Sequence, residues 1–345
     1  MKKLSLYVFL VLMWCNVGNA FFLTLTKCEG DDYKQWTNCF GSYTSEDGRK
    51  YTGEFGNEPG KREGYGTSIT SKGKLVGKFK DNKPNGIGTL SLSDGDRRVY
   101  FSEWNNGHMD GLGTYNFKET TYVGYLKDSN PSGYGILIIN KNKWIGQFDV
   151  IPNGFIFREN QKAQVLIGNF KNGVLGEKFE NIKPQCKGNY SPQWTNCFGE
   201  VIISEAKIIF NTYFLNGDPS SKGAFQILEG GMFPEREGIY VGQFTNGESE
   251  GQGVKTWNVS ESIYVGEWKN GYMHGKGILR RNDGEIYIGN YKKGKKNGYG
   301  TILHSDGRKY EGEFLNSFAH GKGICTFEDD RRFNCKMKEG LWVRE

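Results

Sequence analysis

Proline is scarce and glycine is not periodic in this sequence, which has 8 Pro and 50 Gly among 345 residues and no three-residue glycine repeat. This composition excludes a collagen-like chain and a proline-rich disordered chain. It also argues against a helical protein, because glycine costs roughly 1 kcal/mol relative to alanine at each interior helical position. Aromatic residues are as frequent as glycine, with 23 Phe, 19 Tyr and 8 Trp. Together the two residue classes indicate an all-β architecture.

A dominant charge of one sign is also missing. The chain carries 45 Lys and Arg and 39 Asp and Glu, which are interspersed and leave a formal net charge of +6. Nucleic-acid binding normally requires basic residues clustered on one face, so no nucleic-acid partner is expected. One basic cluster, which we interpret as a solvated hairpin loop, comprises Lys292, Lys293, Lys295 and Lys296.

The sequence lacks the motifs of known catalytic and cofactor sites. Its Gly-x-Gly strings never extend to a dinucleotide fingerprint or a P-loop, and no Gly-x-Ser-x-Gly elbow occurs. Zinc sites need closely spaced Cys pairs or nearby His, and neither is found. His108, His274 and His320 lie in the turn just before Gly-x-Gly, so the repeat described below explains them better than acid–base chemistry. We expect no enzyme, no cofactor and no metal. A weaker alternative is a hydrolase in the divergent middle of the chain, with the carboxylates Glu200, Glu205, Asp218 and Glu229.

The one long apolar run lies at the N-terminus. It extends from Leu4 to Trp14, follows Lys2 and Lys3, and precedes Gly18-Asn19-Ala20. These features predict a secretory signal peptide that is cleaved after Ala20, because the run is only about half of the roughly 20 residues needed to span a bilayer. No later stretch reaches 18 consecutive apolar residues, so we expect an exported protein in the periplasm, at the cell surface or secreted.

Six cysteines remain once the signal peptide and its Cys15 are removed. Two pairs have ten intervening residues each and end in the same string, Gln-Trp-Thr-Asn-Cys-Phe-Gly, which favours pairing within each copy. The last two cysteines flank a hairpin, where a directly opposed pair suits a disulfide and a diagonal pair at about 7 to 8 Å does not. The expected disulfides are Cys28 with Cys39, Cys186 with Cys197, and Cys325 with Cys335.

One short pattern recurs along the chain: aromatic, any residue, Gly, Glu or Gln, aromatic, a short turn, and then Gly-x-Gly. Successive copies are 22 to 25 residues apart within each run, and from Tyr264 onward the interval is a strict 23. Clear copies begin at Tyr51, Tyr100, Tyr122, Trp144, Tyr240, Tyr264, Tyr287 and Tyr310, and weaker ones at Leu75 and Leu166.

Each copy has the alternation of a β-strand. In Tyr264-Val265-Gly266-Glu267-Trp268 the two rings and the glycine share one face, while Val265 and Glu267 occupy the other. A neighbouring ring can cover the gap above the glycine, and Lys269-Asn270-Gly271 supplies a turn to the returning strand. Asp-Gly pairs such as Asp283-Gly284 end each return strand. One repeat is therefore predicted to be two antiparallel strands and two turns.

These residues resemble MORN repeats (membrane occupation and recognition nexus). The best match is Tyr264 to Gly277, and copies cover most of residues 40–345, with a departure at roughly 149–239. The resemblance implies a non-enzymatic scaffold that mediates protein or cell-envelope interactions. Some members of the family associate with membranes, so an alternative is a module that binds membrane headgroups or polysaccharide through peripheral contact.

The repeats predict an elongated, twisted, single-layer antiparallel sheet of stacked hairpins. About ten repeats give roughly 20 strands, and open sheets beyond about 10 strands tend to curl or split, so we expect a bend or break near 149–239. The expected divisions are a signal peptide (1–20), a disulfide-containing cap and first hairpin (21–50), a first repeat block (51–180), a second disulfide module with divergent repeats (186–239) and a second block with a disulfide hairpin (240–345).

The aromatic stripe has two interpretations. It either fills the gaps above the glycines or also offers partly exposed rings to a peptide, a glycan or a second copy of the array. The structural interpretation is favoured, and homo-oligomers remain open because edge strands can pair. The candidate binding face comprises Tyr100, Trp104, Tyr122, Trp144, Tyr264, Trp268, Tyr287, Tyr310 and Phe314.

Overall fold

The structure is a computed structural model that describes residues 25–93, 98–118, 120–139, 142–149, 154–159, 165–171, 174–178, 186, 191, 197–203, 208–215, 218–227, 237–329 and 331–343. In the strands between 154 and 227 the description concerns the backbone. The predicted signal peptide lies outside the described residues, as do the side chains of the middle carboxylates.

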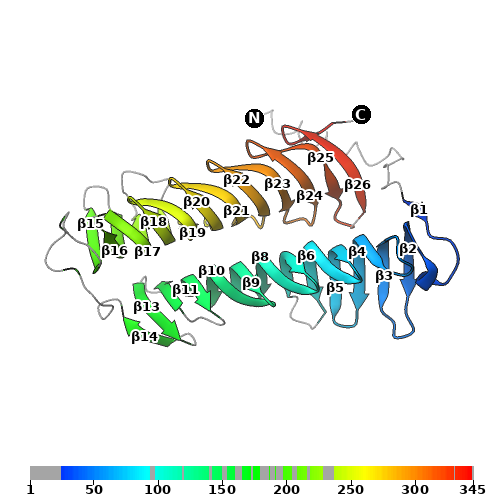
Figure 1. Ribbon diagram of the computed structural model, residues 1–345, viewed down its shortest axis with the longest axis horizontal. Coiled ribbons are helices and arrows are strands. Elements are labelled where there is room, and N and C mark those ends of the chain that lie inside the picture. The colour runs from blue at the N-terminus through cyan, green and yellow to red at the C-terminus, as the bar shows by residue number, and fades with distance from the viewer. Residues whose placement is uncertain are drawn as a thin grey trace, which may run out of the picture.

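Two large sheets contain the described strands, and in each the strand order follows the sequence (Figure 1). The first sheet has 14 strands: β1 (Thr26–Lys27), β2 (Cys39–Thr44), β3 (Lys50–Phe55), β4 (Arg62–Thr70), β5 (Gly73–Lys80), β6 (Lys83–Leu92), β7 (Val99–Asn105), β8 (His108–Phe117), β9 (Thr120–Lys127), β10 (Asn130–Ile139), β11 (Asn142–Asp149), β12 (Gly154–Glu159), β13 (Val165–Lys171) and β14 (Val174–Lys178).

The second sheet has 13 strands: β15 (Cys197–Ile203), β16 (Ile208–Leu215), β17 (Asp218–Ile227), β18 (Gly238–Thr245), β19 (Glu248–Trp257), β20 (Ile263–Lys269), β21 (Tyr272–Arg280), β22 (Ile286–Lys292), β23 (Lys295–Leu303), β24 (Lys309–Leu315), β25 (Phe318–Thr326), β26 (Arg332–Lys338) and β27 (Leu341–Trp342). A short 3-10 turn, η1 (Tyr33–Gln35), precedes β2. The expected all-β sheet of stacked hairpins is confirmed, and the expected break lies between Lys178 and Cys197.

Each repeat is a hairpin with a tight turn and a bulge. In β20 and β21, Lys269 pairs with Tyr272 across Asn270-Gly271, whose φ angles of 48° and 73° are those of a type I′ turn. Further along, Gly266 pairs with Gly277 and Glu267 with His274, so two residues of β21 have no partner on β20. The first of these, Gly275, has a φ of 52°, which explains the first glycine of Gly-x-Gly.

The rings of each repeat lie on its glycines and on the rings of the next repeat. Tyr264 is fully buried, and its hydroxyl donates to the carbonyl of Glu267 at 2.9 Å. A Cβ on Gly266 would lie 2.6 Å from that hydroxyl oxygen, so the glycine leaves the space that the ring fills. The Tyr264 ring meets Trp268 edge-on at 5.1 Å and Tyr291 of the following repeat at 5.2 Å. This contact between repeats holds the array in line.

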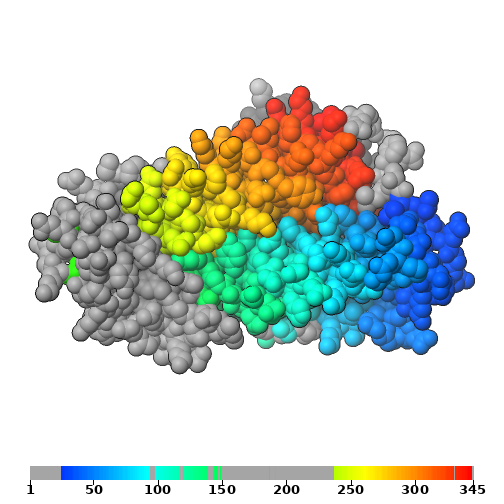
Figure 2. Space-filling model, in the orientation of Figure 1, coloured from blue at the N-terminus to red at the C-terminus, as the bar shows by residue number. Residues whose placement is uncertain are grey.

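The two sheets pack face to face through their other surfaces, which the sequence analysis did not anticipate. Strands β8, β9, β10 and β11 lie against β21, β20, β19 and β18 respectively, so the chain runs out along one sheet and back along the other (Figure 1). Figure 2 shows the two layers closed against each other. The buried side chains of this interface include Phe101, Leu112, Val123, Ile136, Ile145, Ile239, Val241, Val254, Val265, Ile278 and Ile288. Each sheet is a single layer, as predicted, and the molecule has two.

Polar contacts join the sheets beside this apolar interface. The Lys78 ammonium lies 2.6 Å from the buried Glu311 carboxylate, and the Tyr125 hydroxyl donates to Gln252 Oε1 at 2.8 Å. All four residues belong to positions that face away from the aromatic stripe. The face opposite the aromatic stripe therefore forms the interface between the sheets where β8 to β11 meet β18 to β21.

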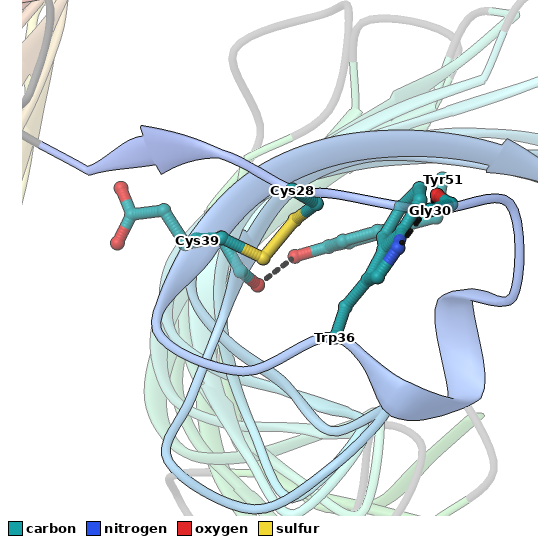
Figure 3. The surroundings of a disulfide bond; sticks show 6 residues. Cys28, Gly30, Trp36, Cys39 and Tyr51 are labelled. Carbon is teal, nitrogen blue, oxygen red and sulfur yellow. Dashed lines mark hydrogen bonds between the residues drawn. A yellow bond between two sulfur atoms is a disulfide. The ribbon is translucent and has the colours of Figure 1, made fainter.

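The first disulfide closes the free edge of the first sheet. Cys28 and Cys39 are bonded with their Cα atoms 5.0 Å apart, beside Trp36 (Figure 3). The Trp36 ring covers Gly41, where an added Cβ would lie 2.5 Å from the ring, and its Nε1 donates to the Gly30 carbonyl at 3.1 Å. Trp36 thus takes the place over this glycine that a tyrosine has in a repeat, and the module acts as a cap.

The other two predicted disulfides have different outcomes. Cys186 is disulfide-bonded, whereas the side chain of its expected partner Cys197 lies outside the described residues. Cys325 and Cys335 are bonded, although in the strand register they are diagonal, since Cys325 pairs with Phe333. The expectation that a diagonal pair would be too distant was wrong. Strand twist shortens one diagonal, and the Cα atoms lie 5.9 Å apart.

Removing the first disulfide tests the cap. In the double variant Cys28→Ser/Cys39→Ser we expect the free energy of unfolding to fall by about 3 kcal/mol, because the unfolded chain regains the freedom of the closed loop. Hydrogen exchange measured by mass spectrometry should show that the variant exchanges faster than the wild-type protein in β2 and β3, and that β24 changes less. The variant Ser45→Ala, on the same hairpin, serves as the control. Unchanged protection of β2 would show that the disulfide does not stabilise this edge.

Candidate functional site

The aromatic stripe proposed as a binding face is almost entirely core. Eight of its nine side chains are buried, and Tyr100 is half-buried. Burial also raises the pKa of the Tyr310 hydroxyl to about 12. The stripe does not present an exposed row of rings, because each ring lies against a glycine and is covered by the next repeat. The buried members are Trp104, Tyr122, Trp144, Tyr264, Trp268, Tyr287, Tyr310 and Phe314.

The repeated glutamate position has a structural use that the sequence analysis missed. From the sequence, one glutamate at the same place in four repeats (Glu54, Glu103, Glu267 and Glu313) predicts pairs with Lys or Arg on neighbouring strands. Instead, Glu267 Oε1 accepts the backbone N–H of Lys276 at 2.9 Å, and Glu103 Oε2 accepts that of Leu112 at 2.8 Å. These N–H groups lie in the bulge, where the strand ladder gives them no partner. Glu103 also pairs with Lys276 of the other sheet at 3.3 Å.

Glu54 occupies the same position near the end of the sandwich, where burial raises the pKa of its carboxyl. The backbone N–H of Tyr65 and the charges of Arg332 and Lys78 oppose this shift. A raised folded-state pKa means that the folded protein holds the proton more strongly than the unfolded chain. This stabilisation is present at low pH and is lost as the pH rises through the folded-state pKa.

The variant Glu54→Gln should therefore gain stability relative to the wild-type protein as the pH rises from 4 to 7. The reason is that Gln keeps an acceptor for the backbone N–H but never buries a charge. Denaturant unfolding at several pH values measures the difference. The exposed Glu248→Gln serves as the matched control, and a difference that does not change with pH would contradict the expectation.

The lysine cluster predicted as a solvated loop is only partly so. Lys292, Lys293 and Lys295 are exposed, but Lys296 is half-buried. Its ammonium lies 3.1 Å from Glu285 Oε1 and 5.0 Å from the centre of the Tyr287 ring. Burial lowers the pKa of Lys296. The fourth lysine therefore belongs to the aromatic core, because the strand alternation turns it inward.

Exposed apolar side chains gather instead along the tight turns of the second sheet. Tyr272, Phe318 and Leu341 are 54%, 55% and 72% exposed, and each is the first residue after a turn. Lys295 has the same position in the intervening repeat, so the interval is 23 residues throughout. We call the exposed apolar and basic residues that border or lie in these turns the turn row: Lys269, Tyr272, Lys292, Lys293, Lys295, Leu315, Phe318, Lys338 and Leu341.

The turn row has a rigid backbone. Successive turns are joined by hydrogen bonds from Gly294 N to the Met273 carbonyl at 2.9 Å, and from Gly340 N to the Ala319 carbonyl at 2.9 Å. The rings rest on the turn of the next repeat: a Cβ on Gly340 would lie 3.4 Å from Phe318 Cδ1. The exposed faces of the rings are thus held in a line rather than on mobile loops.

Three of the corresponding turns described in the first sheet are polar. Lys80 pairs with Lys83, Asn105 with His108, and Lys127 with Asn130 across them. The row of rings is therefore a property of the second sheet. The sequence analysis missed it, although the apolar residues at positions 272, 318 and 341, in register with the 23-residue repeat, were a signal that could have found it.

Two other kinds of site, a metal-binding cluster and a membrane-spanning helix, are not found in the described residues. Within the ranges given above, no group of three or more His, Cys, Asp or Glu side chains is placed to hold a metal ion. Across the same ranges, the structure has no helix long and apolar enough to cross a bilayer.

Comparison with known proteins finds the MORN repeat. The family model matches residues 76–97, 100–119, 240–259, 264–286, 287–307 and 310–330. Among solved structures, one described as a streptogramin B lyase structure covers 93% of this chain and 87% of its own, with 13% identity and a TM-score of 0.14, which is too low to carry an argument. No curated protein matches the chain.

Proposed function

Since the chain is a MORN-repeat protein, we propose that it is a non-enzymatic, exported scaffold whose turn row binds a protein partner. The observation that carries this proposal is the exposure of Tyr272, Phe318 and Leu341 in one line on a rigid backbone. Exposed rings held in place lose little conformational freedom on binding and are favoured at protein interfaces. Most other rings of the repeats are buried in the cores, so the turn row is one of the parts of the repeat left available for a partner.

The proposal of a scaffold rather than an enzyme is supported by the uses found for the repeated polar residues. The glutamates accept backbone N–H groups of the bulges, and His274 and His320 contribute their carbonyls as acceptors to Tyr264 and Tyr310. These roles are structural. Export is supported by the two described disulfides, because such bonds persist in oxidising compartments.

Comparative capture from cell-envelope extract tests the proposal. The purified protein and the variant Tyr272→Ser/Phe318→Ser are used as bait, and the bound proteins are quantified by mass spectrometry. The control variant Val259→Ser/Ile69→Ser also removes two exposed apolar side chains, but outside the row. We expect at least one protein whose enrichment falls tenfold or more with the row variant and is retained with the control. Identical capture by all three baits would refute the proposal.

The exposed lysines of the turn row give some support to the alternative of binding to anionic headgroups. Co-sedimentation with vesicles with and without anionic lipid measures this directly. Salt-sensitive binding that is abolished by Lys292→Ser/Lys295→Ser, without any row-dependent protein capture, would favour the alternative over the scaffold.

A further inference from the structure

We infer that the turn row recognises an acidic segment in the polyproline II conformation, with an apolar residue at every third position. This inference rests on the proposed function and names the chemistry of the partner. Three properties of the row carry it: its repeat distance, its charge and its preformed backbone.

The repeat distance of the row matches a period of three residues in polyproline II. Phe318 and Leu341 are one repeat apart, and Tyr272 is two repeats before Phe318. One repeat is two strands, so successive positions lie about 10 Å apart at about 4.8 Å per strand. A polyproline II helix has three residues per turn and rises about 3.1 Å per residue, which returns the same face every 9 to 10 Å or so. A β-strand is a poorer match, because its faces alternate with a period of two and residues i and i+3 point to opposite sides.

The charge of the row is positive between the apolar positions. Lys292, Lys293 and Lys295 lie between Tyr272 and Phe318 along the row, and Lys338 lies beside Leu341. Across the turns from Lys269 to Leu341 the one exposed acidic residue is Glu339. Lys295 itself takes the place of an apolar residue in its repeat, and acidic residues of the ligand near Lys292, Lys293, Lys295 or Lys338 would face lysines. Each such pair is weak at a surface, but several together give complementarity and faster association.

The row also presents its apolar side chains, two rings and Leu341, from turns whose backbones are already linked. The turns from Ser249 to Gly340 are linked by hydrogen bonds, and neither the row nor a polyproline II ligand needs to become ordered on binding. A bilayer is a poorer match, because single side chains about 10 to 20 Å apart offer it no contiguous apolar patch.

Synthetic peptides test the inference through fluorescence anisotropy with the purified protein. The probe is a labelled dodecapeptide of four Pro-Glu-Glu units, which is about 37 Å long and spans the row. We expect saturable binding that weakens as salt is raised. It should weaken at least tenfold in Tyr272→Ser/Phe318→Ser and in Lys292→Ser/Lys295→Ser, and should be unchanged in Val259→Ser/Ile69→Ser. Thermal unfolding of each variant verifies that it is folded, which is expected because all these side chains are exposed.

Three comparison ligands make the outcome decisive. A peptide of six Pro-Glu units has the acidic and proline content but a period of two, and a peptide of four Pro-Lys-Lys units reverses the charge. Equal binding of either, or no binding of the probe, overturns the inference, as does row-dependent binding of anionic vesicles in place of the probe. If capture from extract still depends on the row while the probe fails, the partner chemistry is wrong and the scaffold stands. If both fail, the proposed function fails with it.

Discussion

Replacing Val265 with Asp is expected to lower the free energy of unfolding by about 4 kcal/mol or more, because it places an unpaired carboxylate in an apolar interface. Val265 is fully buried, and it belongs to the same cluster as Val123 and Ile136 of the opposite sheet. In the variant, the two sheets lose this apolar contact and can no longer pack as closely against each other. Denaturant unfolding measures the loss in free energy, and small-angle scattering should report a larger maximum dimension for any variant that remains folded.

The same substitution at an exposed valine provides the control. Val259 is 76% exposed and lies in the turn before β20, so Val259→Asp should change stability by less than about 0.5 kcal/mol. If the free energy of unfolding of Val265→Asp lies within about 1 kcal/mol of the wild-type value, which is the error of such a comparison, the sheets do not depend on this interface.

Gly266→Ala is expected to cost about 3 kcal/mol of stability, because overpacking against immobile neighbours is strongly destabilising. An added Cβ would lie 2.5 Å from the Cα of Gly277 and 2.6 Å from the Tyr264 hydroxyl oxygen. The first neighbour is the backbone of the paired strand, which cannot withdraw without breaking the ladder. The variant should therefore show a lower midpoint of denaturation and a loss of the near-ultraviolet signal of the buried tyrosines.

A glycine with open space around it distinguishes this effect from glycine replacement in general. Gly247 has a φ of 77° and no heavy atom within 4 Å of an added Cβ. Asn tolerates this backbone conformation, so Gly247→Asn should lower stability by less than about 1 kcal/mol. Equal losses in the two variants would mean that the ring above Gly266 has room to move, contrary to the packing described.

Much of the hairpin could be predicted from local residue order. The alternation in Tyr264-Val265-Gly266 identified which side chains share a face, and the turn at Asn270-Gly271 was placed correctly. The pairing of Cys28 with Cys39 was also confirmed. The bulge was missed, because Gly275 is explained only when the returning strand is seen to have two extra residues opposite Glu267. With the bulge, the role of the glutamate was missed as well.

The aromatic stripe predicted as a binding face is mostly buried, and the reason is physical. An aromatic stripe gives the same sequence pattern whether its rings face solvent or pack against the next repeat. Here Tyr287 meets Phe314 of the next repeat at 4.9 Å, and such contacts bury the stripe. The turn row was overlooked because Tyr272 and Phe318 follow turns, where exposure depends on the twist of the stacked hairpins rather than on strand alternation.

The sequence by itself determined the repeating unit, its two faces and the break between two arrays, because these depend on residues that are near one another along the chain. Only the tertiary structure decided which face was covered and by what. Val265 and Val123 are 142 positions apart in the sequence, and nothing local to either indicates the other. Their burial follows from the return of the second sheet onto the first, which hides the aliphatic face and leaves the turns of the second sheet exposed.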